Sequence, residues 1–151
     1  MSVAAMAALG VTRSGDEELV AIVENDACGV DALQCLTGCT YGKGNLLFRD
    51  FGKNVYTLYS RLSGKGVRVV FHGQGVPSGL REDKAAFIRF LQECPDEDVV
   101  TLTMVNDDLP KPARIRNSVY CQLCHEAVMD TRLREMDGQV VCIPCAEHHD
   151  H

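Results

Sequence analysis

Four of the eight cysteines in this 151-residue chain lie in two Cys-x2-Cys pairs near its C-terminus, and their spacing constrains the fold more than any other feature. Cys121 and Cys124 form the first pair, 17 residues follow, and Cys142 and Cys145 form the second pair. Two residues between cysteines let both sulfurs of a tight turn point at one centre, and two such turns supply four thiolates. We therefore expect one Zn²⁺ ion bound by all four cysteines. Because the protein would fill every coordination position, this zinc would be structural and not catalytic.

The residues between the two pairs indicate how such a site is built. Asp137-Gly138 is a favoured dipeptide for a hairpin turn, and Val140-Val141 leads into the second pair. A knuckle, a hairpin and a second knuckle are typical of a zinc ribbon or a treble clef. The alternative, two redox-active cysteine pairs, is disfavoured because no βαβ pattern surrounds them. A tail of about forty residues buries little apolar surface, so metal binding would supply much of its folding free energy.

Other polar residues near the pairs are less specific. His125 follows the first pair and could replace a cysteine, but a surface histidine is the favoured interpretation. The last four residues, His148-His149-Asp150-His151, could bind metal weakly, but a frayed terminus is the default expectation. The basic residues around the tail could contact nucleic acid, but we favour a role in offsetting the negative charge of a tetrathiolate centre. These basic residues are Lys111, Arg114, Arg116, Arg132 and Arg134.

Composition narrows the classes of partner and compartment. The net charge of −6 disfavours a broad contact with a nucleic-acid backbone. No segment reaches the roughly 20 apolar residues of a membrane span, so we expect no membrane partner. The apolar residues 3–11 have no positive charge before them and do not fit an export signal. Without export, the cysteines are thiols reserved for metal or chemistry, and we expect a reducing, cytoplasmic location.

Periodicity and turn residues predict a mixed domain of helices and strands ahead of the tail. Leu109-Pro110-Lys111-Pro112 is a linker because two prolines force an extended path, which places the domains at 1–109 and 110–151. Asp26 is the expected cap of the second helix, and Gly38 its end. The predicted helices cover 1–10, 29–37 and 80–93, the predicted strands 19–24, 55–62, 67–72 and 99–105, and a hairpin turn 63–66.

The second predicted helix carries an unusual set of cysteines. Cys28, Asp31 and Cys35 are spaced i, i+3 and i+7, which places them on one helical face, and Cys39 follows one turn later. A thiol or metal site and an ordinary buried face both fit this pattern, since cysteine is among the most commonly buried residues. The glycine-rich turn around Lys43 lacks the spacing of a phosphate-binding loop, so its glycines instead permit unusual backbone angles.

At these residues the chain resembles the FmdE family, which takes its name from a component of formylmethanofuran dehydrogenase. The resemblance covers nearly the whole chain, and many members end in a zinc finger with this cysteine pairing. The matching signature reads Glu24…Cys28-x2-Asp31-Ala32-x-Gln34, then Gly38-Cys39-Thr40-x-Gly42-Lys43-Gly44-Asn45-Leu46, then Asp50-x-Gly52-Lys53.

The resemblance implies a fold, an assembly and a second site. It implies an α+β core, with mixed helices and sheet, followed by a small C-terminal treble-clef (C4) zinc finger. It also implies a homodimer and a cleft for a second metal or a substrate. The positions that would line this cleft are Cys28, Asp31, Gln34, Cys39, Lys43 and Asn45.

Two departures from the family pattern bear on the cleft. Members usually open with a histidine-rich segment ending in Cys-Pro-Gly, and this chain starts inside the first helix, so a site shared with that segment would lose ligands. Cys35 lies outside the pattern, and we expect it to be a small core residue. Cys94, at the end of the third predicted helix, has no assigned role.

Three functional hypotheses follow. The first is an FmdE-like metal-binding protein, accessory or related to a molybdenum or tungsten formylmethanofuran dehydrogenase, with Cys28 and Cys39 as thiolates and Asp31, Lys43 and Asn45 around them. The second is a zinc-finger interaction or regulatory module that contacts protein or nucleic acid. The third is an enzyme that acts alone, for which His72 is a candidate base, although a loop histidine is the favoured interpretation.

Overall fold

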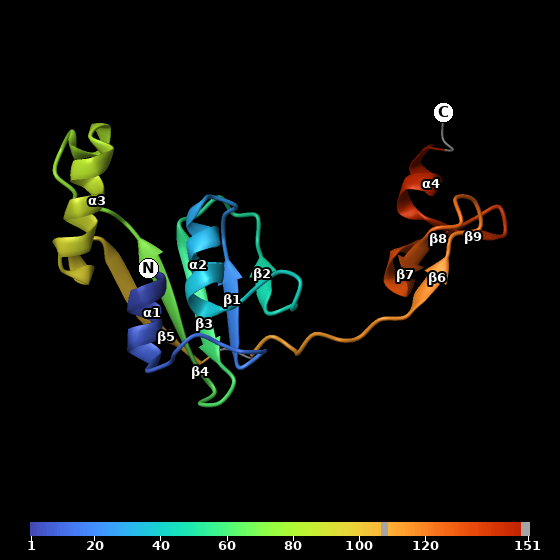
Figure 1. Cartoon of the computed structure of the whole chain (residues 1–151), viewed down its shortest axis with the longest axis horizontal. Coiled ribbons are helices and arrows are strands. Elements are labelled where there is room, and N and C mark those ends of the chain that lie inside the picture. The colour runs from blue at the N-terminus through green and yellow to red at the C-terminus, as the bar shows by residue number, and fades with distance from the viewer. Residues whose placement is uncertain (107–108, 149–151) are drawn as a thin grey trace. The chain divides into compact units, whose positions relative to one another are not determined.

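The computed structural model describes residues 1–106 and 109–148 and divides the chain into two compact units, Met1–Ala113 and Arg114–His151 (Figure 1). The boundary predicted from the prolines lies four residues earlier, at 109/110. The difference arises because the first residues of the linker are bonded to the core. Arg61 donates a hydrogen bond to the Pro110 carbonyl, and the Ala113 amide donates one to the Glu17 carboxylate.

A five-stranded mixed sheet forms the centre of the first unit, with the strand order β2-β1-β3-β4-β5 (Figure 1). The β1–β2 pair is parallel and the other pairs are antiparallel. The structure adds β2, which the sequence did not predict because three residues are too few to show a period. The strands are β1 (Leu19–Val23), β2 (Leu46–Phe48), β3 (Val55–Ser60), β4 (Lys65–Phe71) and β5 (Val100–Val105).

Helices α1 (Ser2–Leu9) and α2 (Gly29–Thr37) pack on one face of this sheet (Figure 1). Ala5 of α1 and Leu33 of α2 join the larger core cluster, together with alternate residues of β1, β3 and β4. The intervening residues of β1, Val20 and Ile22, form a second cluster with Tyr59 on the opposite face. Strand β1 is therefore buried on both faces, which explains why its sequence is apolar without alternation.

Helix ends follow the turn residues, with one correction. Helix α2 ends at Gly38, which has a φ of +74°, and a Cβ there would collide with the Ser14 carbonyl oxygen. The predicted cap at Asp26 is wrong, because Cys28 occupies the N-cap position and provides no side-chain hydrogen bond. Helix α3 (Lys84–Glu93) follows the short turn η1 (Leu80–Glu82), and the Asp83 carboxylate caps it by accepting from the amides of Ala85 and Ala86. A second short turn, η2 (Asp96–Asp98), precedes β5.

The second unit is built from two hairpins and a short helix. Strand β6 (Ser118–Tyr120) pairs with β7 (Ala127–Met129), and β8 (Leu133–Met136) pairs with β9 (Gln139–Cys142). The short turn η3 (Asp130–Arg132) joins the hairpins, and α4 (Ile143–His148) follows β9. The predicted Asp137-Gly138 turn is confirmed, with φ values of +50° and +76°. The predicted fold class, an α+β core with a small C-terminal treble-clef finger, is confirmed. No helix in the described part of the chain has the length and apolarity needed to cross a membrane.

Asn45 is the polar residue that joins the loops of the core. It is fully buried, and its amide nitrogen donates to the carbonyls of Asp16 at 3.1 Å and Leu19 at 3.0 Å. Its side-chain oxygen accepts from the Thr40 amide at 2.9 Å. The turn after α2 is thereby fixed to the segment that leads into β1.

Replacing Asn45 by alanine is expected to lower the free energy of unfolding by about 2–4 kcal/mol, because three backbone groups lose a hydrogen bond with a fully buried side chain. Denaturant unfolding, followed by circular dichroism, measures the change. Asn106→Ala, at an exposed position, is the matched control and is expected to change stability by less than about 0.5 kcal/mol. Equal stabilities of the two variants would contradict the assigned role of Asn45.

Candidate functional site

The four cysteines of the finger converge on one point. Cys121 and Cys124 lie in the turn between β6 and β7, Cys142 ends β9, and Cys145 lies in α4. Their sulfur atoms all lie within 4.8 Å of one another. Within residues 1–106 and 109–148, this is the one cluster of three or more histidine, cysteine, aspartate or glutamate side chains that could hold a metal ion.

Backbone hydrogen bonds hold the two knuckles in place. The Cys121 amide donates to the Glu126 carbonyl, and the His125 amide donates to the Cys121 carbonyl, which closes the first turn. The Gln122 amide donates to the Val140 carbonyl, so the first knuckle is attached to β9. The Cys142 amide donates to the Cys121 sulfur at 3.3 Å. His125 directly follows Cys124 in the first turn. It has a φ of +61°, and its side chain is exposed.

The electrostatics of these thiols favour a bound cation. Burial would raise the pKa of Cys121, but backbone hydrogen bonds from Cys124, Cys142 and Leu123 outweigh it and lower the pKa to about 6. Hydrogen bonding to Cys142, together with burial, raises the pKa of Cys145 to about 12. Without a cation, one thiolate therefore suppresses the ionisation of its neighbours. Four sulfurs in a closed set match the ligand chemistry of structural zinc, with no position left for water.

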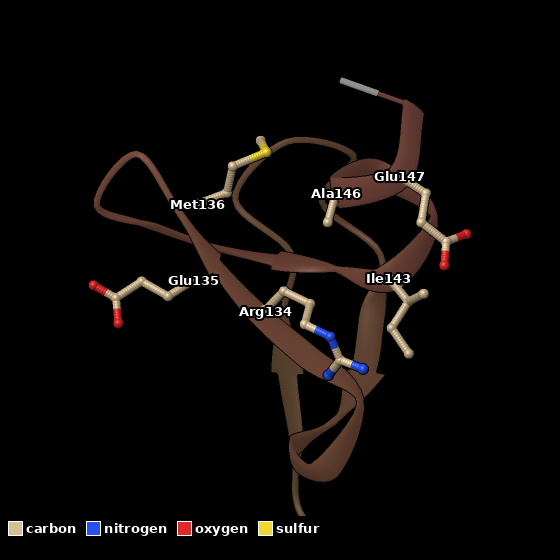
Figure 2. Close-up of a pocket in the computed structure, with 6 residues that line it drawn as sticks. All are labelled: Arg134, Glu135, Met136, Ile143, Ala146 and Glu147. Atoms are coloured by element: carbon tan, nitrogen blue, oxygen red, sulfur yellow. The ribbon is translucent and has the colours of Figure 1, made fainter. Parts of the chain in front are cut away.

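The finger also carries a shallow cleft between β8 and α4, with a volume of about 310 Å³ (Figure 2). Met136, Ile143 and Ala146 supply its apolar wall. Charged side chains surround this wall, and Figure 2 shows the Glu135 carboxylate extending away from α4. The charged residues are Arg134, Glu135 and Glu147. The weak metal candidates at the very end of the chain, His149, Asp150 and His151, lie outside the described residues.

A second cleft, of about 280 Å³, lies in the core beside the start of α2. Cys28 is exposed at the N-cap position, and Asp31 lies one turn further along the helix. Tyr41 and Phe48, which are 78% and 48% exposed, also line this cleft. The sequence interpretation missed these two aromatic residues, although both lie within or beside the family signature.

The structure places the other signature residues at the opposite end of α2. Cys39 follows the helix and is fully buried, and burial raises the pKa of its thiol. The Lys43 ammonium donates to the carbonyls of Asp16 at 3.1 Å and Gly15 at 3.5 Å. A nine-residue helix separates the two ends by about 13 Å. Cys28 and Asp31 therefore share a cleft, whereas Cys39, Lys43 and Asn45 lie around the turn that Asn45 holds.

The remaining candidates have plain structural surroundings. The expectation that Cys35 is a core residue is wrong, since Cys35 is exposed. Leu33 and Thr37 are the buried positions of α2, and residue 35 points away from both. Cys94 is half-buried and packs against the core cluster.

His72 Nδ1 accepts a hydrogen bond from the Gln74 amide at 3.0 Å, so one of its ring nitrogens is used to stabilise the loop that contains it. Gln34 is half-buried on α2.

One electrostatic feature of the core had no sequence signal. The Glu18 carboxylate accepts hydrogen bonds from the Ser14 hydroxyl at 2.5 Å and the Asp16 amide at 2.8 Å. These bonds, with a smaller contribution from the Lys43 charge, lower the pKa of Glu18 from its ordinary value of 4.5 to about 2. Glu18 therefore remains ionised at neutral pH and fixes the approach to β1. This contribution is present above pH 4.5 and is lost as the pH falls toward 2.

Comparisons with known proteins agree with this division of the chain. Residues 114–151 match the prokaryotic dksA/traR C4-type zinc finger. A probable S-adenosyl-L-methionine-binding protein of Archaeoglobus fulgidus is 32% identical over 97% of this chain. The chain spans 46% of the length of that relative.

A solved structure is similar to most of the chain, and a family pattern matches the core. The crystal structure of a tungsten formylmethanofuran dehydrogenase FmdE-like protein from Syntrophus aciditrophicus is similar, with a TM-score of 0.64 and 26% identity. The similarity covers 88% of this chain and 73% of that chain. Residues 1–101, two thirds of the sequence, match the FmdE family of the molybdenum formylmethanofuran dehydrogenase operon. The chain therefore belongs to the FmdE family and carries a C4 zinc finger at its C-terminal end.

Proposed function

We propose that this protein is a cytoplasmic accessory component of a larger oxidoreductase, related to the molybdenum or tungsten formylmethanofuran dehydrogenases, and that its finger holds a structural zinc ion. The observation that carries the proposal is the closed set of four sulfurs attached to an FmdE-type core. A closed thiolate set stabilises a domain and leaves no position for a substrate, which suits a component that supports a partner. The compartment follows from the same site, because its free thiols require a reducing environment.

The zinc assignment rests on the chemistry of the donors. Cys121, Cys124, Cys142 and Cys145 would hold the ion, which would offset half of the charge of the four thiolates and join β9 and α4 to the first knuckle. Val141 is the fully buried aliphatic side chain of the small cluster in the finger, so the apolar contribution to folding is small. Metal binding would supply the larger share.

Cys121→Ser is expected to remove about one zinc per chain and to unfold the finger while the core stays folded, because serine is a poor zinc ligand and the finger has little core of its own. Metal analysis by mass spectrometry and amide spectra of residues 114–148 measure the two effects. Cys35→Ser, at an exposed cysteine outside the site, is the matched control and is expected to retain the zinc. Retention of zinc by Cys121→Ser would contradict the assignment.

The core cleft is proposed as an incomplete second metal site. Cys28 and Asp31 offer one thiolate and one carboxylate on the same wall. Two ligands are too few for the tetrahedral shell of a thiolate metal such as zinc, so the remaining ligands would come from another chain of the assembly. Cys39, Lys43 and Asn45 would hold the turn and would not bind the ion.

Binding of Co²⁺ distinguishes the residues that would bind a metal ion in the core cleft from those that would only hold the turn. Adding Co²⁺ to the zinc-loaded assembly is expected to give a thiolate-to-cobalt absorption band, which is lost in Cys28→Ala and weakened at least fivefold in Asp31→Asn. Cys39→Ala is the matched control, because its sulfur lies at the other end of α2 and is fully buried. Loss of the band in Cys39→Ala, with retention in Cys28→Ala, would reverse the assignment.

We also propose that the protein forms a homodimer through helix α3. This helix has no fully buried residue, and Ile88 and Leu91 are 47% and 37% exposed. A regular amphipathic helix with an exposed apolar stripe suits a helix that packs against another chain. On β5, which is an edge strand of the sheet, Leu102 and Met104 are also exposed.

Ile88→Glu combined with Leu91→Glu is expected to convert the dimer to a monomer, because two charges would have to be buried at the interface. Light scattering after size-exclusion chromatography measures the mass. Val119→Glu combined with Val140→Glu, at exposed apolar positions of the finger, is the control and is expected to leave the dimer intact. A double helix variant that stays dimeric would remove α3 from the interface.

A second candidate function is a finger that recognises another protein. The cleft between β8 and α4 has an apolar wall and a rim of mixed charge, which suits a protein side chain better than a run of phosphates. The S-adenosyl-L-methionine binding named for the archaeal relative is not extended to this chain, because more than half of that protein lies outside the match.

A further inference from the structure

Residues 109–113, which we name the strap, run along the core before the finger begins. Leu109 packs against the cluster of Val20, Ile22 and Tyr59. The Pro110 carbonyl accepts a hydrogen bond from Arg61 Nη1 at 2.7 Å. At the far end of the strap, the Ala113 amide donates to Glu17 Oε2 at 3.3 Å. The strap is thus bonded to the core at both ends.

Ala113 lies directly over the turn between α2 and β2. A Cβ placed on Gly44 would lie 2.6 Å from the Ala113 Cβ, and Gly44 has a φ of +75°. Ala113 can therefore lie this close to the turn only because residue 44 is a glycine and has no side chain. Gly44 belongs to the turn that carries Lys43 and Asn45, so the strap touches the centre of the family signature.

The segment Gly15–Leu19 connects the strap to the same turn a second time. Its carbonyls accept from Lys43 and Asn45, and its Glu17 carbonyl accepts from Arg61 Nε at 3.0 Å. Arg61 therefore bonds this segment and the strap with one guanidinium group. A change in the strap would reach the turn both through Ala113 and through this segment.

The bonding of Arg61 is incomplete in the closed arrangement. Nη2 is buried and has no hydrogen-bond partner among the residues that the structure describes. A buried donor without an acceptor is unfavourable, and opening the strap would give this nitrogen access to water. The unsatisfied donor offsets part of the energy gained from the other two bonds. Opening the strap would therefore relieve part of its own energetic cost at Arg61.

We infer that residues 109–113 form a releasable strap. This strap, which links the core to the finger, is coupled to the Thr40–Asn45 turn. When the hydrogen bond from Arg61 to the Pro110 carbonyl breaks, Ala113 moves away from Gly44. The turn then loses one of the contacts that hold it in position. A partner that pulls on the finger would thereby loosen the signature turn of the core. All of these contacts lie within the core and its linker, so the coupling does not depend on the identity of the partner enzyme.

Hydrogen exchange on the full-length, zinc-loaded protein tests the coupling. The amides to follow are Ala113 in the strap, and Thr40 and Gly44 in the turn, whose acceptors are Asn45 Oδ1 and the Tyr41 carbonyl. Arg61→Ala is expected to speed the exchange of all three at least tenfold. Arg68→Ala is the matched control, because it removes the ion pair between Arg68 on β4 and Glu24. It is expected to leave the exchange rates of all three amides unchanged.

Each of four results would overturn the inference. Faster exchange at Ala113 with an unchanged turn would show a strap without coupling, and unchanged exchange at all three amides would show no strap. Equal acceleration in the Arg68→Ala control would show general loosening of the core. If Arg61→Ala does not fold, Ala113→Gly takes its place, since it removes only the contact with residue 44. This variant is expected to speed exchange at Gly44, and an unchanged rate there would overturn the inference.

Discussion

Asn45 has no access to water, so its amide group must find its hydrogen-bond partners inside the protein. It finds them in the carbonyls of Asp16 and Leu19 and in the amide of Thr40. Asp16 precedes β1, Leu19 begins it and Thr40 follows α2, so the interaction fixes the end of α2 against the start of β1. The parallel pairing of β2 with β1 follows directly, because β2 begins at the residue after Asn45. A buried polar group of this kind favours one arrangement over others, since any alternative would leave the amide unsatisfied.

The finger is held by a different kind of interaction. Its buried cluster consists of Cys121, Val141 and Cys142, which is too small to fold a domain by apolar burial alone. Four sulfurs brought within 4.8 Å would repel one another once ionised, and a cation converts this repulsion into attraction. One chain thus uses two solutions to the same problem. The core relies on central strands, β1 and β3, that are buried on both faces, and the finger relies on thiolates around a metal.

The residues of the family signature fall into two groups within the core. Cys28 and Asp31 face a cleft at the start of α2, whereas Cys39, Lys43 and Asn45 lie at its end. Residues that are close in sequence therefore have separate surroundings, since Cys28 and Asp31 are exposed whereas Lys43 and Asn45 donate to backbone carbonyls. The strap contacts Gly44 in the turn at the end of α2, and Tyr41 of this turn also lines the cleft.

The sequence alone determined those features that depend on local spacing. The two Cys-x2-Cys pairs predicted the C4 finger, Asp137-Gly138 predicted its hairpin, and Gly38 marked the end of α2, because turns and helix ends are set by a few adjacent residues. Only the tertiary structure decided what depends on long-range packing. It exposed Cys35, replaced Asp26 by Cys28 at the helix cap, added the three-residue β2 and bonded the linker to Arg61. It also separated Cys28 from Cys39, because the nine-residue helix α2 lies between them. Periodicity reports which side of an element is apolar, but which partner covers that side is fixed only when distant segments meet.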